Sequence, residues 1–381
     1  MARHYLDHAS TSPLRPSARH AMLAELAEPS ADPGRIHAEG MRARFALETA
    51  REQVAGLFGA RGREVVFTSG ATEAIAHGML AARQHPGVIV LPAVEHSAVR
   101  FAAARRAGRV QVVGVDPEGA VDARAMIEMI DHLHRSEGPV SMVCLQLGNH
   151  EVGAVQPVAE VVDACRDLGI TTLVDAAQAA GHLAVSFKNL GPDLLAVSAH
   201  KFGGPPGIGA LLIRRGLRIP SLLVGGDQER ARRAGLENLI AAAGFGAAAA
   251  ELTDADQLAV EAATAHRQTH ELRRILGAID GVTVVGPSSP DARLPHIVCA
   301  TIDGIEPQGV LLGLDQKGIA AHSGSACSSE SLEPSPVLEA MGVDAHRSLR
   351  LSVGWSTVDA DIDAVAHALP PVIAHLRSLG T

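Results

Sequence analysis

Short apolar runs rich in Val, Ile and Leu alternate with longer alanine-rich runs over the first 215 residues. The apolar runs predict strands at 63–70, 87–93, 109–115, 140–149, 170–178, 193–200 and 207–215. The alanine-rich runs predict helices, clearest at 71–84, 96–108 and 158–169. Strands that are apolar throughout and alternate with helices indicate a mostly parallel seven-stranded sheet with helices on both faces.

The pattern changes near residue 228, where long helices are predicted as far as residue 277. Shorter elements follow: strands at 282–286, 295–304 and 348–354, a helix at 308–318 and a helix at the C-terminal end. Few strands with helices beside them suggest a smaller α+β domain. We therefore predict an α/β protein whose domains are a large one, 15–255, and a small one made of 1–14 and 256–381.

Composition narrows the class of protein. The chain has 381 residues, 47% of them hydrophobic, and a net charge of −9, which argues against a nucleic-acid footprint spread over the surface. The N-terminal stretch lacks the apolar core of a signal peptide, and no apolar run is long enough to cross a membrane. We expect a cytoplasmic protein with no membrane or direct nucleic-acid partner.

The four cysteines show no CxxC spacing and no dense framework, so we expect neither disulfides nor a metal site, in keeping with a reducing cytosol. They are Cys144, Cys165, Cys299 and Cys327. Cys327 has an unusual setting, because it lies in "SGSACSSESLEPSP", a polar run typical of an exposed loop. A structural thiol usually has apolar neighbours.

Two polar positions follow apolar strands and could bind an aldehyde cofactor. Lys201 precedes a glycine-rich turn, where a ligand can approach the backbone closely. In isolation it reads as a surface lysine, but a lysine at a site's mouth can form a Schiff base. Asp175 reads alone as a turn or cap residue, yet pyridoxal 5′-phosphate (PLP) needs an acidic partner for its ring nitrogen. Gln178 could then donate to the ring phenolate.

Further polar positions also lie just past strand ends, where ligands of such sheets bind. Ala71 and Thr72 open a predicted helix whose backbone N–H groups could hold a phosphate, although Thr72 alone is an ordinary cap. His96 could stack on a cofactor ring and move protons, and Asn149 could face a substrate. Arg350 could clamp a carboxylate with two hydrogen bonds, or form a salt bridge at the domain surface.

Taken together and in this order, eight motifs resemble the cysteine desulfurases of the NifS/IscS type, which have the class V aminotransferase fold. The motifs are "DHASTSP", "TSGATEA", "EHSAV", "NHEVGAVQP", "VDAAQAAGH", "SAHKFGGPPGIGAL", "SGSACSSESLEPS" and "SLRLSVG". They span nearly the whole chain, and "SGSAC" with a long following loop is similar to the first group of these enzymes. The general build also resembles DndA-like desulfurases of DNA phosphorothioation.

The resemblance implies PLP fold type I, a homodimer and PLP held on Lys201. It implies that Asp175 pairs with the ring nitrogen, that Gln178 binds the phenolate oxygen and that His96 stacks on the ring. The residues implied to hold the phosphate are Ala71, Thr72, Ser198 and His200. Asn149 and Arg350 are implied to bind L-cysteine, and Cys327 to carry its sulfur as a persulfide to a protein acceptor.

Several positions depart from the family pattern, among them Asp32 and Arg35 in "DPGRIH", and one bears on the phosphate. The chain reads "RAGLEN" where the family usually has "RSGTEN", so Leu236 replaces a threonine that would reach the neighbouring subunit's phosphate. Leucine has no donor, and the phosphate would lose one hydrogen bond.

The implied reaction converts L-cysteine to L-alanine, with Lys201 and His96 moving protons and Cys327 receiving sulfur as a thiolate. The acceptor could serve iron–sulfur clusters, thionucleosides or DNA phosphorothioation.

Two alternatives stay open. One is another fold type I PLP enzyme, such as a selenocysteine lyase, a C–S lyase or an aminotransferase. The other is a non-catalytic PLP-binding scaffold that docks sulfur acceptors.

Overall fold

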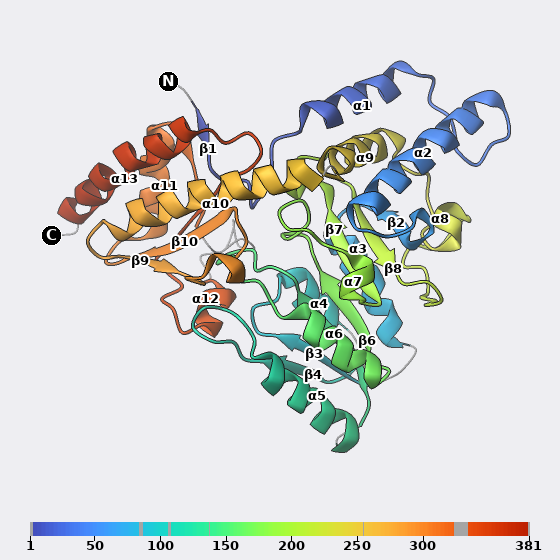
Figure 1. Ribbon diagram of the computed structural model, residues 1–381, viewed down its shortest axis with the longest axis horizontal. Helices are drawn as coiled ribbons and strands as arrows, with labels where there is room; N and C mark the ends of the chain where they lie inside the picture. The colour runs from blue at the N-terminus through green and yellow to red at the C-terminus, as the bar shows by residue number, and fades with distance from the viewer. Residues whose placement is uncertain are drawn as a thin grey trace.

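A seven-stranded sheet forms the centre of the larger part of the computed structural model (Figure 1). The structure describes residues 3–83, 87–105, 108–136, 138–253, 255–323 and 334–379. In sheet order the strands are β2 (Val65–Thr68), β8 (Gly209–Ile213), β7 (Leu194–Ser198), β6 (Thr171–Asp175), β5 (Val140–Gln146), β3 (Val88–Pro92) and β4 (Val110–Val113). Only β8 runs antiparallel to its neighbours, so the predicted mostly parallel sheet is confirmed.

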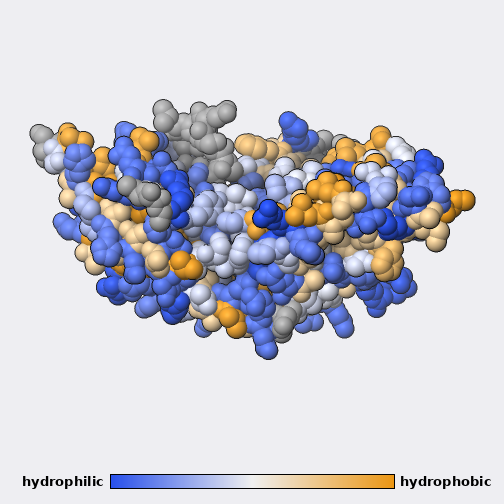
Figure 2. Space-filling model, turned by 90° about the horizontal axis from the view of Figure 1, so that it is seen from above, coloured by the Kyte–Doolittle hydropathy of each residue, from blue (hydrophilic) through white to orange (hydrophobic). Residues whose placement is uncertain are grey.

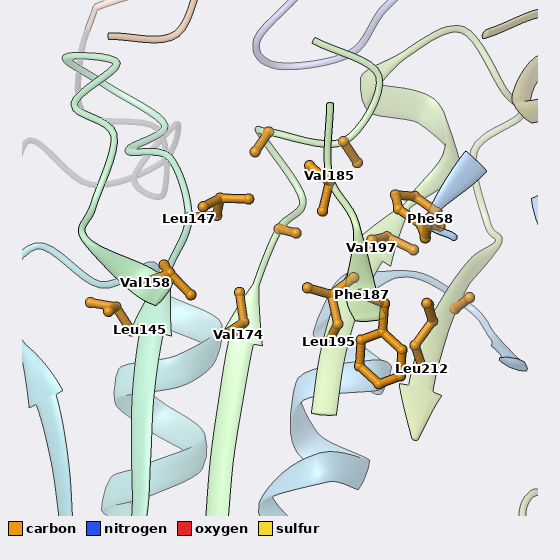
Figure 3. Close-up of a cluster of buried hydrophobic side chains, with 14 of the residues drawn as sticks. Phe58, Leu145, Leu147, Val158, Val174, Val185, Phe187, Leu195, Val197 and Leu212 are labelled. Carbon is orange, nitrogen blue, oxygen red and sulfur yellow. The ribbon is translucent and has the colours of Figure 1, made fainter. Parts of the chain in front are cut away.

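Each face of this sheet is covered by helices, as predicted. On one face Leu145, Val174, Leu195 and Leu212 project from four neighbouring strands into a single core (Figure 3). The helices that contribute to this core are α1 (Pro16–Ala27), α2 (Ala38–Leu57), α5 (Ala123–Ser136), α6 (Val158–Asp167), α7 (Phe187–Leu190) and α9 (Leu239–Thr253). The opposite face packs against α3 (Ala71–Gly78) and α4 (Ser97–Ala104). Apolar residues on both sides explain why β5 is buried at every position.

A second core lies around the small antiparallel sheet β12 (Ser348–Ser352), β10 (Ile297–Ile302) and β9 (Val282–Val285). Its helices are α10 (Ala255–Gly277), α11 (Pro307–Gln316) and α13 (Asp359–Leu379), and α12 (Pro336–Ala340) lies nearby. Figure 1 shows α10 running from the larger part to this smaller one. The α+β pattern is as predicted, whereas the exact division at residue 255 stays a prediction.

The N-terminal segment belongs to the second core by its contacts. The short strands β1 (His4–Tyr5) and β11 (Ile319–Ala320) pair in parallel, and Leu6 is fully buried in that core. The Leu6 carbonyl accepts a hydrogen bond from the Ser352 N–H at 2.8 Å, which ties the segment to β12. The chain then enters the larger part, where the Ser12 N–H donates to the His200 carbonyl at 2.8 Å.

The helices expected from residue 228 begin later than predicted. α8 (Gln228–Ala231) is one short turn, and Glu229, Arg230 and Ala231 have φ angles of 51°, 57° and 60°. These left-handed conformations are costly for residues with a side chain and cannot continue into a right-handed helix. The long helix therefore starts only at Leu239. The predicted helix 71–84 is also shorter, since it tightens into a 3₁₀ turn after Gly78.

A buried ion pair holds this left-handed turn against the large sheet. The Glu229 carboxylate accepts hydrogen bonds from both Arg51 terminal nitrogens, at 2.5 and 2.8 Å, and from the Phe67 N–H at 2.9 Å. The side chains of Arg51 and Glu229 are 2% and 1% exposed. Arg51 also contacts Glu48, whose side chain is 40% exposed.

We expect Glu229→Ala to lower the free energy of unfolding by about 3–5 kcal/mol, because it leaves the buried Arg51 charge without its main partner. Glu48→Ala removes the solvent-exposed partner of the same arginine and should cost less than about 1 kcal/mol. Urea denaturation of both variants measures the difference. Equal losses would show that the buried pair does not stabilise the fold.

None of the helices in the described ranges combines the length and apolar character needed to cross a membrane.

Candidate active site

A cavity of about 570 Å³ opens at the carboxyl edge of the large sheet. The predicted site residues that line it are Ala71, Thr72, His96, Asp175, Gln178, Ser198, His200, Lys201 and Arg350. Most of them lie at or just after the carboxyl ends of β2, β3, β6 or β7. These strand ends lie at the same edge of the sheet. Arg350 comes from β12 of the small sheet, so the two cores meet at this cavity.

Lys201 and Gln178 are held by the same backbone oxygen. The Lys201 ammonium Nζ donates to the Ala9 carbonyl at 2.6 Å and to the Ser10 carbonyl at 3.1 Å. The Gln178 amide Nε2 donates to the Ala9 carbonyl at 2.7 Å. The segment 9–11, which also lines the cavity, was not assigned a role from the sequence. Its carbonyls could not have been recognised there, because backbone groups carry no residue-type signal.

Asp175 has a second carboxyl group beside it. Its Oδ1 accepts the Ala177 N–H at 2.9 Å, and Asp175 is only 7% exposed. Glu95 is buried nearby, and its Oε1 accepts the N–H of Gln146, the residue that pairs with Asp175 across β5 and β6. Burial, reinforced by the Asp175 carboxylate, raises the pKa of Glu95 to about 8. Glu95 is therefore protonated at neutral pH, and Asp175 carries the negative charge at this edge.

The start of α3 also borders the cavity, where Gly70, Ala71 and Thr72 line it. The helix is preceded by Gly70, and a side chain on Gly209 would lie 2.7 Å from the Gly70 Cα, so only glycine lets β8 approach the turn. Ser198 and His200 line the cavity beside this helix start. Burial, with the nearby Lys201 charge, lowers the pKa of His200 to about 4, and its neutral ring contacts the Thr11 hydroxyl.

Arg350 brings a buried guanidinium to the cavity. Its side chain is 1% exposed, and its terminal nitrogens donate to the His150 carbonyl at 2.8 Å, to Ser10 Oγ at 2.8 Å and to Asp7 Oδ1 at 3.1 Å. Its Nε is buried and has no hydrogen-bond partner among the described residues. An unsatisfied donor on a buried guanidinium is costly, which favours an anionic ligand here.

The structure places His96 in the cavity lining and Asn149 outside it. The His96 ring caps α4 by accepting the Ala98 N–H at 3.1 Å and lies edge-on to the His150 ring, with centroids 5.0 Å apart. Asn149 is fully buried outside the cavity lining, and its Oδ1 accepts the N–H groups of Glu151 and Val152 at 2.9 Å. His150, which the sequence analysis did not single out, lines the cavity instead. The sequence signal that could have identified His150 is its position directly after Asn149.

Comparison with known proteins assigns the family. Residues 4–365 match the model of the aminotransferase class-V family. The chain belongs to the aminotransferase class-V family. It is 37% identical to an "IscS-like cysteine desulfurase" of Mycobacterium tuberculosis, with 98% of this chain and 97% of the relative covered. It is 36% identical to "Cysteine desulfurase IscS 1" of Archaeoglobus fulgidus, with 98% of both chains covered.

A solved structure supports the same assignment. The fold superposes on a NifS-like protein from Rickettsia africae with a TM-score of 0.88 at 28% identity, over 98% of this chain and all of the other. The family and fold expected from the motifs are thereby confirmed. Proteins of this family depend on PLP.

The cavity residues fit that cofactor. An amine at Lys201, a carboxylate at Asp175 and an amide at Gln178 lie along one edge, and the glycine-lined start of α3 suits a phosphate. Side chains of these three types could bind the aldehyde carbon, the ring nitrogen and the phenolate of PLP. The cofactor would be held by Lys201, Asp175, Gln178 and the start of α3.

The described cysteines are poor nucleophiles. Cys144, Cys165 and Cys299 are all buried, and burial raises the pKa of Cys165 and of Cys299 to about 12 and that of Cys144 well above its usual range. Their thiols stay protonated at neutral pH. Cys327 lies outside the described residues, so its predicted role stays a prediction.

We expect Glu95 to lower the stability of the cofactor-free protein as the pH rises from about 4.5 to about 8. In the unfolded chain this carboxyl ionises near its ordinary pKa of 4.5, whereas the folded protein keeps its proton to about pH 8. The free energy of unfolding therefore decreases by about 1.4 kcal/mol per pH unit in that window. Glu95→Gln removes the ionisation and should flatten the slope by that amount in denaturant titrations from about pH 5.5 to about pH 7, well inside that window. An unchanged slope would show that Glu95 is already ionised at neutral pH.

Proposed function

We propose that this protein is a PLP-dependent cysteine desulfurase that converts L-cysteine to L-alanine and stores the sulfur as a persulfide on Cys327. The observation that carries the proposal is one cavity that joins Lys201, Asp175 and the buried guanidinium of Arg350. The enzyme class predicted from the motifs is confirmed by the relatives. They are named cysteine desulfurases, and the match covers nearly their whole length. The roles of individual residues and the sulfur acceptor are proposals.

The cofactor site follows from the side chains described above. When bound, PLP accepts the electron pair released as the Cα–H bond of an amino acid breaks. Asp175 would keep the ring nitrogen of the cofactor protonated, and its neutral neighbour Glu95 adds no second charge. Gln178 would donate to the phenolate oxygen, while Ser198, His200 and the N–H groups at the start of α3 would hold the phosphate.

The substrate is recognised by its carboxylate and positioned for proton transfer. Arg350 offers its unsatisfied Nε, and the Ser10 and Asp7 contacts hold the guanidinium plane. The Lys201 amine would take up the Cα proton of the bound amino acid. His96, which projects into the cavity from the start of α4, shuttles a proton. Asn149 stabilises the turn whose carbonyl at His150 orients Arg350.

Sulfur transfer requires a thiolate that can reach the cavity. The Cys327 thiolate attacks the substrate sulfur, an S–S bond forms, and the C–S bond breaks with its electron pair going to carbon. That carbon takes up one proton and Lys201 returns the other to Cα, so the products are alanine and a persulfide. Ser335, at the start of α12, donates a hydrogen bond to the buried Glu151 at 2.5 Å, which anchors α12 to the residue that follows His150 of the cavity lining.

This reaction is tested by incubating the purified protein with L-cysteine and measuring alanine and sulfide. Cys327→Ala should reduce persulfide formation at least tenfold and should keep the visible colour of bound PLP. Lys201→Ala should lose that colour. Cys165→Ala, which removes a buried thiol, is the matched control and should retain persulfide formation. Unchanged turnover in Cys327→Ala would favour a selenocysteine lyase or C–S lyase, and inactive wild-type protein that binds PLP would favour a scaffold.

The protein is further proposed to be a homodimer in the cytoplasm. It would transfer its sulfur to a protein acceptor. Large apolar side chains are exposed on α1, α2 and the loops near α8, and Figure 2 shows hydrophobic residues on the side of the molecule where α1 and α2 lie. These residues are Leu23, Leu26, Ile36, Met41, Phe45, Val224 and Leu236. A contact between two copies would cover them. Iron–sulfur, thionucleoside and DNA phosphorothioate pathways are the candidate destinations of the sulfur.

Leu236, 63% exposed in the single chain, offers a test of the dimer. Restoring a donor with Leu236→Thr should tighten PLP binding about 2- to 10-fold, from a gain of about 0.5–1.5 kcal/mol for one hydrogen bond to the partner's phosphate. Leu236→Val shortens the side chain without adding a donor and is the matched control. Absorbance titration of cofactor-free protein gives the dissociation constants, and sedimentation gives the oligomeric state. Equal affinities in a confirmed dimer would refute the cross-subunit contact.

A further inference from the structure

Two imidazole rings lie stacked next to the cavity residues Gln178 and Lys201. The rings of His182 and His296 have centroids 3.5 Å apart and planes 13° from parallel. His182 belongs to the turn after β6, in the larger part of the molecule. His296 immediately precedes β10 of the small sheet, and its carbonyl accepts the Val353 N–H at 2.9 Å. The stack therefore joins the two cores beside the cofactor site.

Each ring contacts one of the two residues held by the Ala9 carbonyl. His182 Nε2 lies 3.2 Å from the Lys201 carbonyl oxygen, and His296 Nε2 lies 3.4 Å from Gln178 Oε1. Both partners are acceptors, so both Nε2 atoms carry the proton. His296 Nδ1 is then an acceptor, and it has no partner among the described residues.

The orientation of the Gln178 amide depends on this contact. Its NH₂ group donates to the Ala9 carbonyl, the same oxygen that the Lys201 ammonium contacts at 2.6 Å. The NH₂ group thus lies beside Lys201, where the phenolate of a ring linked to that lysine would be. If the amide turned over, its oxygen would face the phenolate and the Ala9 carbonyl, and both contacts would be repulsive.

His296 is well suited to hold this amide because it stays neutral. It is fully buried, and the titratable and charged groups that face it are His182, His8, Lys201 and Arg350, all basic. Burial, together with these groups, lowers the pKa of His296 well below its usual range. A neutral ring with a fixed Nε2–H, clamped against His182, is a rigid donor.

We propose that His296 is a positioning residue that fixes the Gln178 amide with its NH₂ group toward the cavity, through the hydrogen bond from His296 Nε2 to Gln178 Oε1. The inference rests on the proposed function, since Gln178 acts on the phenolate of bound PLP. A hydrogen-bond donor at the phenolate stabilises its negative charge. The phenolate then holds the proton on the lysine-linked nitrogen less strongly, so that nitrogen loses its proton at a lower pH.

The test is the pH midpoint of the visible absorbance band of the holoenzyme, measured without substrate. His296→Met fills a similar volume without a donor and should raise the midpoint by about half to one pH unit, since one unit equals about 1.4 kcal/mol. His296→Gln places an amide donor near the original Nε2 and should restore the wild-type midpoint. In a Gln178→Ala background, His296→Met should add no further shift, because the effect passes through Gln178.

Three controls separate the possible outcomes. His8→Gln replaces a buried imidazole that contacts Ser12 and Thr357 and not Gln178, so it should leave the midpoint unchanged. If His296→Met does not fold, His182→Ala removes the stacking ring and should raise the midpoint, whereas His182→Phe keeps a ring and should raise it less. Equal midpoints in wild type, His296→Met and His182→Ala would overturn the inference, and a wild type without a visible band would overturn the proposed function itself.

Discussion

The backbone oxygen of Ala9 organises this site. It accepts hydrogen bonds from both Lys201 and Gln178, the two side chains that a lysine-linked aromatic ring would meet at one edge. The segment that carries Ala9 is itself fixed on both sides, by Ser352 of the small sheet and by the His200 carbonyl of the larger part. A displacement of either core would therefore move the acceptor on which both side chains depend.

Electrostatic neutrality is the second constraint on the site. Asp175 supplies the one carboxylate that faces the proposed ring nitrogen, and the neighbouring Glu95 stays protonated because burial and Asp175 both disfavour its charge. The histidines around Lys201 are held neutral in the same way, since burial lowers the pKa of His8 to about 3 and of His182 to about 4. Neutral donors can orient a ligand without competing with Arg350 for its carboxylate.

Residues from distant parts of the chain meet at the cavity because two cores close on the same sheet edge. Arg350 and His296 come from the small sheet, while Lys201 and Asp175 follow strands of the large one. Hydrogen bonds from Arg350 to the His150 carbonyl and from His296 to Gln178 cross between the two. The proposed substrate and cofactor contacts thus depend on the relative placement of both sheets.

The sequence alone determined the alternation of strands and helices, the parallel sheet and the positions of Lys201, Asp175 and Arg350, because apolar periodicity and polar residues at strand ends are local signals. It could not reveal the Ala9 carbonyl, the His182–His296 stack or the protonated Glu95, since each arises from groups that only folding brings together. The left-handed turn at Glu229 was likewise decided by its tertiary pairing with Arg51, which overrides the local helical pattern. Burial sets charge states, and burial is a property of the folded chain.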